Sequence, residues 1–474
     1  MLSEDSLALI LSSLKQERGF YKSLTTFCVP IVLQNLLSAS VGFVDTFMLG
    51  MLGQNELAAI SLAQTPFFIA MLMMFGLSAG GTILISQYWG KGDMRTISRV
   101  LGLTWMCAFI LTTGIGTALF MFPHQIMRLL TNNEVLIDIA ARYCRIMAYS
   151  MVLNSFTIVY IGARRSCGAP IFGTVVVSIS AVVNVILNYI LIFGNFGAPA
   201  LGVEGAAIGT LITRTLEVLI TIGFIFFADR KTKIMALYVR YLLIPGKVIL
   251  KDFIRYSLPV LANETLWSVG VSLYIVVYGH MTASSDIMAA FSLAGNIERL
   301  VLLVVFCLGH ATAVFLGKAI GEGKSPEEVY SLGKTFLALA FTIGLVSGLI
   351  LIIVAYGIIQ PFVFPLLDLT RAAQAICIFM LVSRGILTSV RSCNGTLMIG
   401  VLRSGGDVNF ILIADVAGIY FWALPLAALF AFVFDLHIYV IFLIILSEDI
   451  IKGVLGFWRF RSKKWIKNLT KDIA

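Results

Sequence analysis

Long apolar stretches alternate with short polar connections along the whole chain. Each stretch has about 20–30 residues, the length that a helix needs to cross the hydrocarbon core of a bilayer. The sequence therefore predicts an all-α polytopic membrane protein with 12 transmembrane helices. The predicted spans are residues 24–51, 57–87, 97–121, 135–161, 171–193 and 203–227, followed by 253–279, 287–316, 330–356, 373–399, 410–434 and 438–460.

The composition agrees with this pattern and excludes several classes of protein. Hydrophobic residues make up 59% of the 474 residues and charged residues only 12%, which is far from the balance of a soluble domain. The net charge of +9 does not indicate a nucleic-acid partner, because no basic stripe with interleaved aromatic residues occurs. We expect the lipid bilayer and small-molecule substrates as partners, and a monomer.

Motifs for enzymatic chemistry and for cofactors are absent from the sequence. The seven cysteines contain no Cys-x-x-Cys pair, so we expect neither disulfides nor a zinc site. Walker A, His-Glu-x-x-His and Gly-x-Ser-x-Gly patterns are also missing. An integral membrane enzyme, the alternative from another class, would need catalytic groups clustered at one membrane face, and the sequence offers none. We therefore expect no enzyme, no cofactor and no metal beyond a coupling ion.

Basic residues indicate the orientation in the membrane. They are concentrated in every second connection, in the 228–252 linker and in the tail, whereas the alternate connections hold only Arg128 and Arg371. Cytoplasmic loops carry such an excess of lysine and arginine. The sequence thus predicts a multi-pass protein of the cytoplasmic membrane with both termini in the cytosol.

The second half of the chain repeats the first. Residues 58–92 align with 289–323 without a gap and share ten of 35 positions, and Pro30 matches Pro259 just upstream. Because each half has an even number of spans, both enter the membrane from the same side and form parallel repeats. The predicted domains are a cytosolic segment (1–23), an N-terminal six-helix lobe (24–228), a linker (229–252), a C-terminal six-helix lobe (253–460) and a basic tail (461–474).

One carboxylate, Asp45, lies well inside the first span. On a helix it shares a face with Gln34 and Ser38, and Pro30 near the start of the span indicates a kink or a local break. A charge in the middle of a membrane helix costs roughly 2.5–3.5 kcal/mol, so Asp45 should face protein or a wet cavity. We interpret it as an ion or proton site, with a structural hydrogen bond to a neighbouring helix as the alternative.

The fifth span carries a single polar stripe. Ser180, Asn184 and Asn188 follow each other at intervals of four residues on an otherwise apolar helix. Amide, hydroxyl and carboxylate oxygens are hard ligands for a small cation. Together with Asp45 this stripe would make a Na⁺ or proton site, to which Thr210 and Thr213 could add hydroxyl oxygens. The alternative is ordinary hydrogen bonding between helices, which asparagine supports well.

The seventh span carries a carboxylate among aromatic residues. Such a cavity would attract organic cations by charge and by cation–π contact. The alternative is that the carboxylate, Glu264, forms a structural pair with an arginine such as Arg391 of the tenth span. The same reasoning treats Arg214 with Glu217, and Glu298 with Arg299, as structural pairs. The candidate cavity residues are Asn263, Glu264, Trp267, Tyr274, Tyr278, Arg384 and Arg391.

Five segments give the chain a resemblance to a known family. They are PIVLQNLLSASVGFVDTFMLGMLG (30–53), NVILNYILIFG (184–194), LGVEGAAIGTLITR (201–214), LPVLANETLW (258–267) and VLRSGGD (401–407). In this order, within two sixfold halves, they resemble the bacterial multidrug and toxic compound extrusion (MATE) family. The resemblance implies a V-shaped, two-lobe exporter that exchanges H⁺ or Na⁺ for amphipathic, often cationic compounds.

The resemblance also implies which residues bind the coupling ion. The family's site in the N-terminal lobe falls on Asp45, Asn184 and Asn188. Other members use a glutamate of the seventh span with an aspartate of the tenth, but Glu264 lies about a turn earlier and the tenth span has no acid. We therefore expect no ion site of that pattern in the C-terminal lobe. The alternative within this architecture is a flippase for lipid-linked oligosaccharides, whose cavity would be more cationic and could use Arg384 and Arg391.

Overall fold

The computed structural model of the chain describes residues 16–227, 239–242, 246–282, 284–367 and 369–472. Throughout these ranges the regular structure is helical, as the sequence predicts, and no strand occurs in them. Residues 1–15 of the predicted cytosolic N-terminal segment and most of the 228–252 linker lie outside the described residues. Within the linker the structure describes a short helix, α10 (Val239–Leu242), and residues 246–252, where the next long helix begins.

The first half of the chain follows the predicted spans closely. The short helix α5 between the third and fourth spans was not predicted; it begins at Pro123, where proline's fixed backbone angle suits the first helical turn. The helix α2 runs through Pro30 without a break in the helical assignment. The elements are α2 (Arg18–Gly50), α3 (Gln54–Lys91), α4 (Met94–Met121), α5 (Pro123–Arg128), α6 (Glu134–Ser166), α7 (Ile171–Phe193), η1 (Asn195–Gly197) and α8 (Gly202–Phe227).

The second half is less regular than the first. The eighth predicted span consists of two helices, because α12 ends at Val301 and α13 begins at Leu303. Three segments are π-helical: η2 (Ala355–Val363), η4 (Thr396–Leu402) and η5 (Ala417–Ala423). The remaining elements are α11 (Lys247–Gly279), α12 (Ser284–Val301), α13 (Leu303–Gly321), α14 (Pro326–Val354), η3 (Phe364–Leu366), α15 (Arg371–Gly395), α16 (Val408–Val416), α17 (Leu424–Phe432) and α18 (Ile438–Arg461).

Eleven helical segments in the described residues are long and apolar enough to cross a membrane. The twelfth predicted span, α18, is not among them because it carries Glu448, Asp449 and Lys452 in its middle. Many large apolar side chains are exposed on the described helices, including Phe47 and Phe421 at 71% and 78%. An exterior of this kind suits lipid rather than water.

The chain divides into two compact units. The N-unit comprises Val29–Leu261 with Asp472, and the C-unit comprises the described residues up to Cys28 with Ala262–Lys471. One division lies within α2 directly before Pro30, and the other lies within α11, two residues after Pro259. These are the two prolines that the internal repeat pairs with each other.

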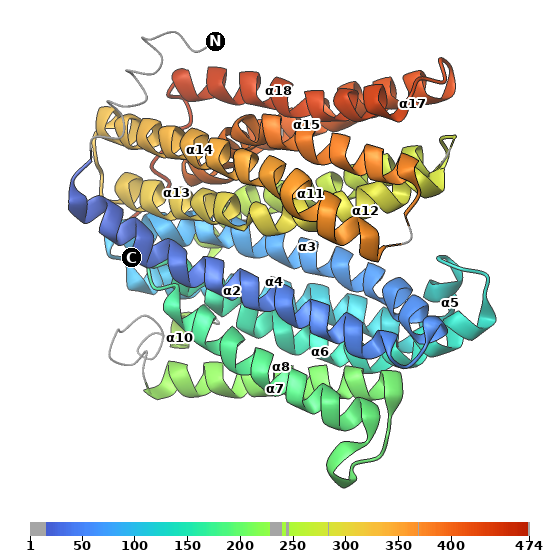
Figure 1. Cartoon of the computed structure of the whole chain (residues 1–474). Helices are drawn as coiled ribbons and strands as arrows, with labels where there is room; N and C mark the ends of the chain where they lie inside the picture. The colour runs from blue at the N-terminus through green and yellow to red at the C-terminus, as the bar shows by residue number, and fades with distance from the viewer. Residues whose placement is uncertain (1–15, 228–238, 243–245, 283, 368, 473–474) are drawn as a thin grey trace. The chain divides into compact units, whose positions relative to one another are not determined.

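Small residues bring helices of the C-unit close together. A Cβ on Gly348 of α14 would lie 2.2 Å from the carbonyl oxygen of Gly385 on α15, so that no larger residue fits there. In lipid such close approach replaces the hydrophobic effect as a source of helix–helix stability. Figure 1 shows α13, α14, α15 and α18 of this unit running side by side.

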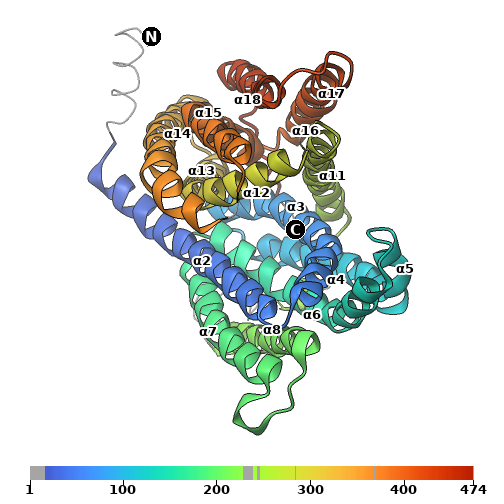
Figure 2. The same ribbon diagram turned by 45° about the vertical axis from the view of Figure 1, so that its right-hand side comes forward.

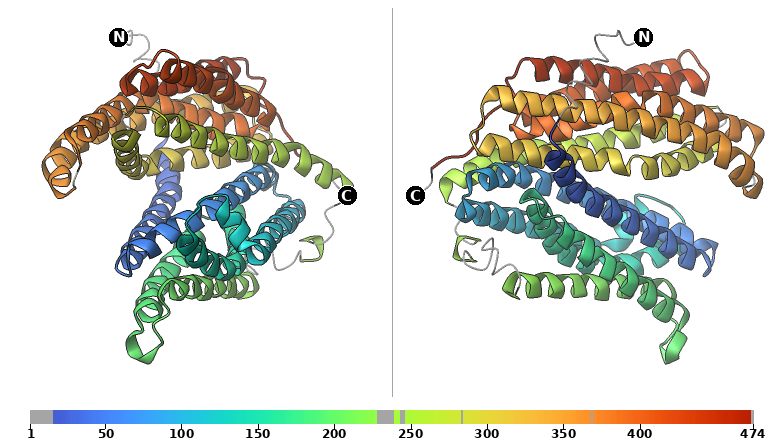
Figure 3. Two further views of the ribbon diagram at one scale, coloured as in Figure 1. Left: turned by 90° about the vertical axis from the view of Figure 1, so that its right-hand side faces the viewer. Right: turned by 60° about the vertical axis from the view of Figure 1, so that its left-hand side comes forward.

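The N-unit has an apolar core near the end of α2 that carries Asp45. Leu49 of α2, Ile60 of α3, Tyr143 of α6 and Ile192 of α7 pack together in it. The helices α3, α4 and α6 pack on one another, and α6 also packs on α8 (Figure 2). The helices α7 and α8 form an antiparallel pair that Figure 3 shows at the edge of this unit.

The basic tail after α18 folds back onto the C-unit. The side chain of Trp465 is fully buried, and its Nε1 donates a hydrogen bond to the carbonyl oxygen of Phe460 over 3.1 Å. The Trp465 carbonyl lies so close to Gly405 that a Cβ there would be 1.7 Å from its oxygen. Lys467 pairs with Asp407 at 3.5 Å. The tail is thus part of the packed structure of this unit.

Substitution of the buried tryptophan should destabilise the C-unit. Trp465→Ala is expected to lower the free energy of unfolding by about 3–5 kcal/mol, the usual cost of truncating a buried aromatic side chain. Trp458→Ala is the matched control, because the Trp458 side chain is 64% exposed. Thermal unfolding of both variants in detergent tests this, and equal unfolding temperatures would show that the tail does not hold the unit together.

Candidate functional site

Asp45 meets the polar stripe of α7 in the N-unit. The Nδ2 of Asn188 donates a hydrogen bond to Asp45 Oδ1 over 2.7 Å and also contacts Asn184 Oδ1 at 3.3 Å. Asn184 and Asn188 are 5% and 1% exposed, so the cluster is shielded from its surroundings on the α7 side. The contacts thus join Asp45 to Asn188, and Asn188 to Asn184, whereas the binding of an ion by these residues stays a prediction.

Several oxygens of this region are buried without a partner. They are Asn188 Oδ1, Gln34 Oε1 and Ser180 Oγ. A buried polar atom that lacks a hydrogen bond costs about 1–3 kcal/mol, so native proteins seldom leave one empty. Only Asn188 Oδ1 belongs to the residue that contacts Asp45, because Gln34 Oε1 lies beside Gly173, roughly 22 Å along α7 from Asn188. The Asn188 oxygen is suited to a cation, a proton donor or a water molecule at the Asp45 site.

Two glycines make room for the polar side chains. A Cβ on Gly209 of α8 would lie 2.5 Å from Asn188 Oδ1, and one on Gly173 of α7 would lie 2.8 Å from Gln34 Oε1. Any larger residue at Gly209 must push the Asn188 amide away from its place beside Asp45. The Gly205-x-x-x-Gly209 pattern therefore serves the site as well as the packing of α8 on α7.

The remaining predicted members of this site lie differently. The Thr213 hydroxyl donates to the carbonyl oxygen of Gly209 over 2.8 Å, and the Ser38 hydroxyl donates to that of Gln34 over 3.0 Å. Both hydroxyls are thus engaged with their own helices. Thr210 is half-buried on α8. Arg214 and the buried Glu217 form the predicted structural pair at 2.7 Å.

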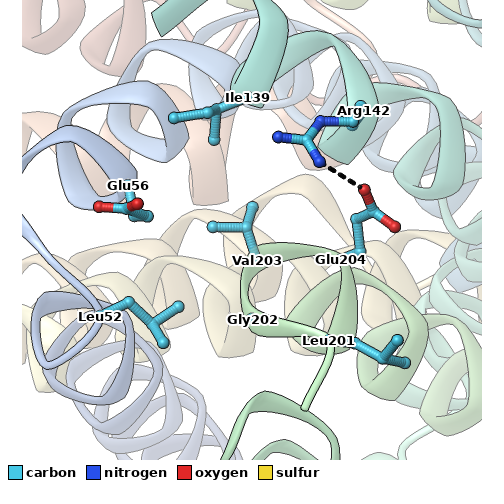
Figure 4. A pocket seen from close by; sticks show the side chains of 8 residues that line it. All are labelled: Leu52, Glu56, Ile139, Arg142, Leu201, Gly202, Val203 and Glu204. Atoms are coloured by element: carbon cyan, nitrogen blue, oxygen red, sulfur yellow. Dashed lines mark hydrogen bonds and ion pairs between the residues drawn. The ribbon is translucent and has the colours of Figure 1, made fainter. Parts of the chain in front are cut away.

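A separate cavity of about 250 Å³ lies at the ends of helices in the N-unit. Figure 4 shows Arg142 of α6 facing Glu204 of α8 across it, and the two side chains are 3.1 Å apart. Glu56 of α3 also faces the cavity, among apolar side chains such as Leu52 and Val203. Arg142 is about half exposed, so this pair lies near the surface.

In the C-unit the predicted cavity residues are engaged in ion pairs and hydrogen bonds. Glu264 pairs with Arg403 at 2.9 Å, and both side chains are largely buried. Arg391, the partner suggested by the sequence, is not the one that Glu264 has. Asn263 donates to Asp415 Oδ2 over 2.9 Å. The side chain of Trp267 is 39% exposed, whereas Tyr278 is buried at 1%.

The two arginines of the tenth span share one carboxylate. Glu298 of α12 forms an ion pair with Arg384 at 2.8 Å and accepts a hydrogen bond from Arg391, which in turn pairs with Asp449 of α18 at 3.1 Å. Glu298 is thus in interhelical pairs, as one of the expected arrangements, but its partners are these two arginines and not Arg299. The two arginines lie two turns apart on α15, so a single acid between them can meet both.

Comparison with known proteins supports the resemblance seen in the sequence. The family model MatE matches residues 30–190. The probable multidrug resistance protein NorM of Thermotoga maritima is 24% identical over 459 residues, covering 95% of each chain. The uncharacterized transporter YisQ of Bacillus subtilis is 23% identical over 457 residues, covering 96% of this chain and 97% of the other.

Solved structures agree in fold along nearly the whole chain. A MOP superfamily transporter from Pyrococcus furiosus has a TM-score of 0.83 at 19% identity, covering 93% of this chain and 95% of the other. The eukaryotic MATE transporter AtDTX14 has a TM-score of 0.80 at 16% identity, covering 97% and 98%. The chain is similar to MATE family transporters along nearly its whole length. It is a multi-pass membrane transporter with a two-lobe architecture of 12 helices.

Several charged residues of this transporter were not predicted from the sequence to form a cluster. Asp415, Glu448 and Lys452 meet in the C-unit, with Lys452 Nζ 3.0 Å from Asp415 and 3.4 Å from Glu448. Glu448 and Lys452 are four residues apart in the last span, an interval that already places them on one helix face. Asp407, the last residue of the VLRSGGD segment, pairs with Arg459 at 3.0 Å, a contact that was not predicted.

Adding a methyl group at Gly209 should disrupt the Asp45 site. Gly209→Ala is expected to displace Asn188 and to reduce ion-driven transport about tenfold, the effect of losing roughly 1.4 kcal/mol. Gly223→Ala, on the same helix where a Cβ meets nothing within 4 Å, is the matched control. Ion-driven transport in vesicles is measured for both variants. Normal transport by Gly209→Ala would show that transport does not depend on the contact of Asn188 with Asp45.

Proposed function

We propose that this MATE transporter exports amphipathic, cationic compounds from the cell in exchange for H⁺ or Na⁺. The observation that carries the proposal is the hydrogen bond from Asn188 Nδ2, which also contacts Asn184 Oδ1, to the carboxylate of Asp45 inside a predicted membrane span. Its place in a bilayer favours neutralisation by an ion, because an ionised carboxylate is costly there.

Ion binding at Asp45 would drive transport by shifting a conformational equilibrium. A ligand shifts such an equilibrium only as far as its affinities for the two states differ. We infer that the ion binds when the site opens to the outside and leaves when it opens to the cytosol. The two six-helix halves would alternate between these states, as the parallel repeats of other secondary transporters do.

The oxygens near Asp45 are compatible with either coupling ion. A proton needs only the carboxylate, whereas Na⁺ would use the carboxylate together with amide and hydroxyl oxygens such as those of Asn184, Asn188 and Ser180. The unpaired Oδ1 of Asn188 and Oγ of Ser180 support a site that can accept a further ligand. Imposing each ion gradient in turn distinguishes the two ions.

The proposed substrate class is based on the names of the relatives and on the ion pairs that occupy the arginines of the C-unit. Relatives such as NorM are named as probable multidrug resistance proteins. An oligosaccharide flippase would call for cationic groups that are open to an anionic lipid, but Arg384 and Arg391 both pair with Glu298. The ion pair with Arg403 likewise supports a structural role for Glu264. We therefore assign ion coupling to Asp45 and not to Glu264.

Removal of the Asp45 charge should abolish coupling. Asp45→Asn keeps the volume of the side chain but cannot bind H⁺ or Na⁺ as a carboxylate does. We expect gradient-driven uptake of a fluorescent cation by everted vesicles to fall at least about tenfold, since each 1.4 kcal/mol of lost ion affinity is a factor of ten.

Ser38→Ala is the control for this experiment, because Ser38 lies on the same helix and bonds only within it among the described contacts. A broad panel of lipophilic cations should be tried with H⁺ and Na⁺ gradients separately. Normal gradient-driven uptake by Asp45→Asn would place the coupling elsewhere. If the wild-type protein moves none of these cations, the proposed substrate class is wrong.

We propose that the protein is a monomer in the cytoplasmic membrane. Both of its termini would lie in the cytosol. Single cysteines at Leu129 or Phe196, which are 85% and 88% exposed, should then react with an impermeant thiol reagent in intact cells. A cysteine at the exposed Lys464 should react only in everted vesicles. The reverse pattern in a cysteine-free background would overturn the orientation.

A further inference from the structure

Lys452 lies between two carboxylates inside the C-unit. Its Nζ is 3.0 Å from Asp415 Oδ1 on α16 and 3.4 Å from Glu448 Oε1 on α18. The three side chains are only 5%, 14% and 12% exposed. We call Asp415, Glu448 and Lys452 the lysine triad.

The surrounding backbone is shaped to admit the lysine. Gly418 lies at the start of the π-helical segment η5, and a Cβ there would be 2.8 Å from Lys452 Cε. π-Helical turns inside longer helices occur frequently at functional sites. Neutral groups from α11 complete the triad's surroundings: Asn263 donates to Asp415 Oδ2, and the Tyr274 hydroxyl bonds Glu448 Oε2.

The charges around the triad do not balance when every group is ionised. The neighbouring acids Glu298 and Asp449 are matched by Arg384 and Arg391, which pair with them directly. Within the triad, two carboxylates face one ammonium group. Tyr278, the other titratable side chain nearby on α11, is neutral as a phenol. One negative charge is therefore left over among these described residues.

An unmatched charge in such a place is expensive. Its removal from water costs several kcal/mol unless another charge compensates it. A metal cation would need several free oxygens, but each of the four carboxylate oxygens of the triad already has a donor partner. The Lys452 ammonium, moreover, occupies the position between the carboxylates where such a cation would bind. The remaining way to neutralise the charge is a proton.

The hydrogen bonds indicate which carboxyl group carries it. Asp415 accepts from the ammonium on one oxygen and from the Asn263 amide on the other, and an amide N–H can only donate. Asp415 therefore stays ionised. Glu448 has Tyr274 as its second partner, and a phenol can either donate or accept a hydrogen bond. Glu448 also has the weaker contact to Lys452.

We propose that the lysine triad is a second protonation site of this transporter and that it holds one proton on Glu448. This site has no residue in common with Asp45 and does not depend on the proposed coupling there. It also differs from the pattern of a seventh-span glutamate with a tenth-span aspartate, because its acids come from α16 and α18. The ligand is a proton, held beside a resident ammonium group.

Infrared spectroscopy of the purified protein in lipid tests this proposal without any transport assay. A protonated carboxyl group gives a C=O stretching band that shifts in D₂O, whereas a carboxylate does not. All variants are made in an Asp45→Asn background, so that Asp45 itself cannot contribute. Near neutral pH we expect one buried carboxylic acid band, and Glu448→Gln should remove it. Glu327→Gln is the control, because the side chain of Glu327 is 73% exposed, and it should leave the band unchanged.

A second variant tests the proposal independently if Glu448→Gln does not fold. Lys452→Met removes the ammonium group, so that both carboxyl groups of the triad must become neutral, and the acid band should grow about twofold because two acids then replace one. Absence of the band from the parent protein would overturn the proposal. So would a band that survives Glu448→Gln but disappears in Asp415→Asn, or one that Lys452→Met leaves unchanged.

Discussion

A charged or hydrogen-bonding group inside a membrane must find its partners within the protein, and this constraint governs the structure throughout. The helices satisfy the hydrogen bonds of their own backbone groups, so that only the polar side chains still need partners. The chain provides these partners in two ways. In the N-unit the carboxylate of Asp45 accepts its hydrogen bond from a neutral amide, that of Asn188. In the C-unit the acids are joined to lysine or arginine in direct pairs.

These two arrangements suit different tasks. The hydrogen bond that Asp45 accepts comes from an amide and not from a cation, so an ion that binds there can neutralise the carboxylate, and loss or gain of that ion can bias the conformation. Glu264, Glu298 and Asp449 of the C-unit, by contrast, are matched by arginines, whereas the lysine triad has one carboxylate more than it has cations. Removal of one partner from such a pair is strongly destabilising, whereas the intact pair contributes little net stability. Pairs such as Glu264–Arg403 therefore define which helices pack together more than they provide an ion site.

The predictable part of the structure follows from local pattern. The spans were predictable because apolar length is set by the bilayer, and α7 begins and ends where the sequence predicts. The contact of Asp45 with Asn188 was predictable because both are isolated polar residues on apolar helices, with few other possible partners. The partners of Glu264 and Glu298 were not, because several arginines were within reach along the sequence. The burial of Trp465 was missed because the surrounding lysines and arginines made the segment resemble a solvated tail.

The central claim, that the coupling ion binds at Asp45, is tested most directly by ion release from purified protein. If an ion and a substrate oppose each other's binding, linkage requires that substrate binding expel the ion. Saturation with a lipophilic cation, in weakly buffered solution with a pH indicator and in parallel with a sodium electrode, measures that release. We expect the wild-type protein to release H⁺ or Na⁺ when the lipophilic cation binds. The Asp45→Asn variant should still bind the cation but release no ion. Undiminished release by Asp45→Asn would show that the coupling ion does not bind at Asp45.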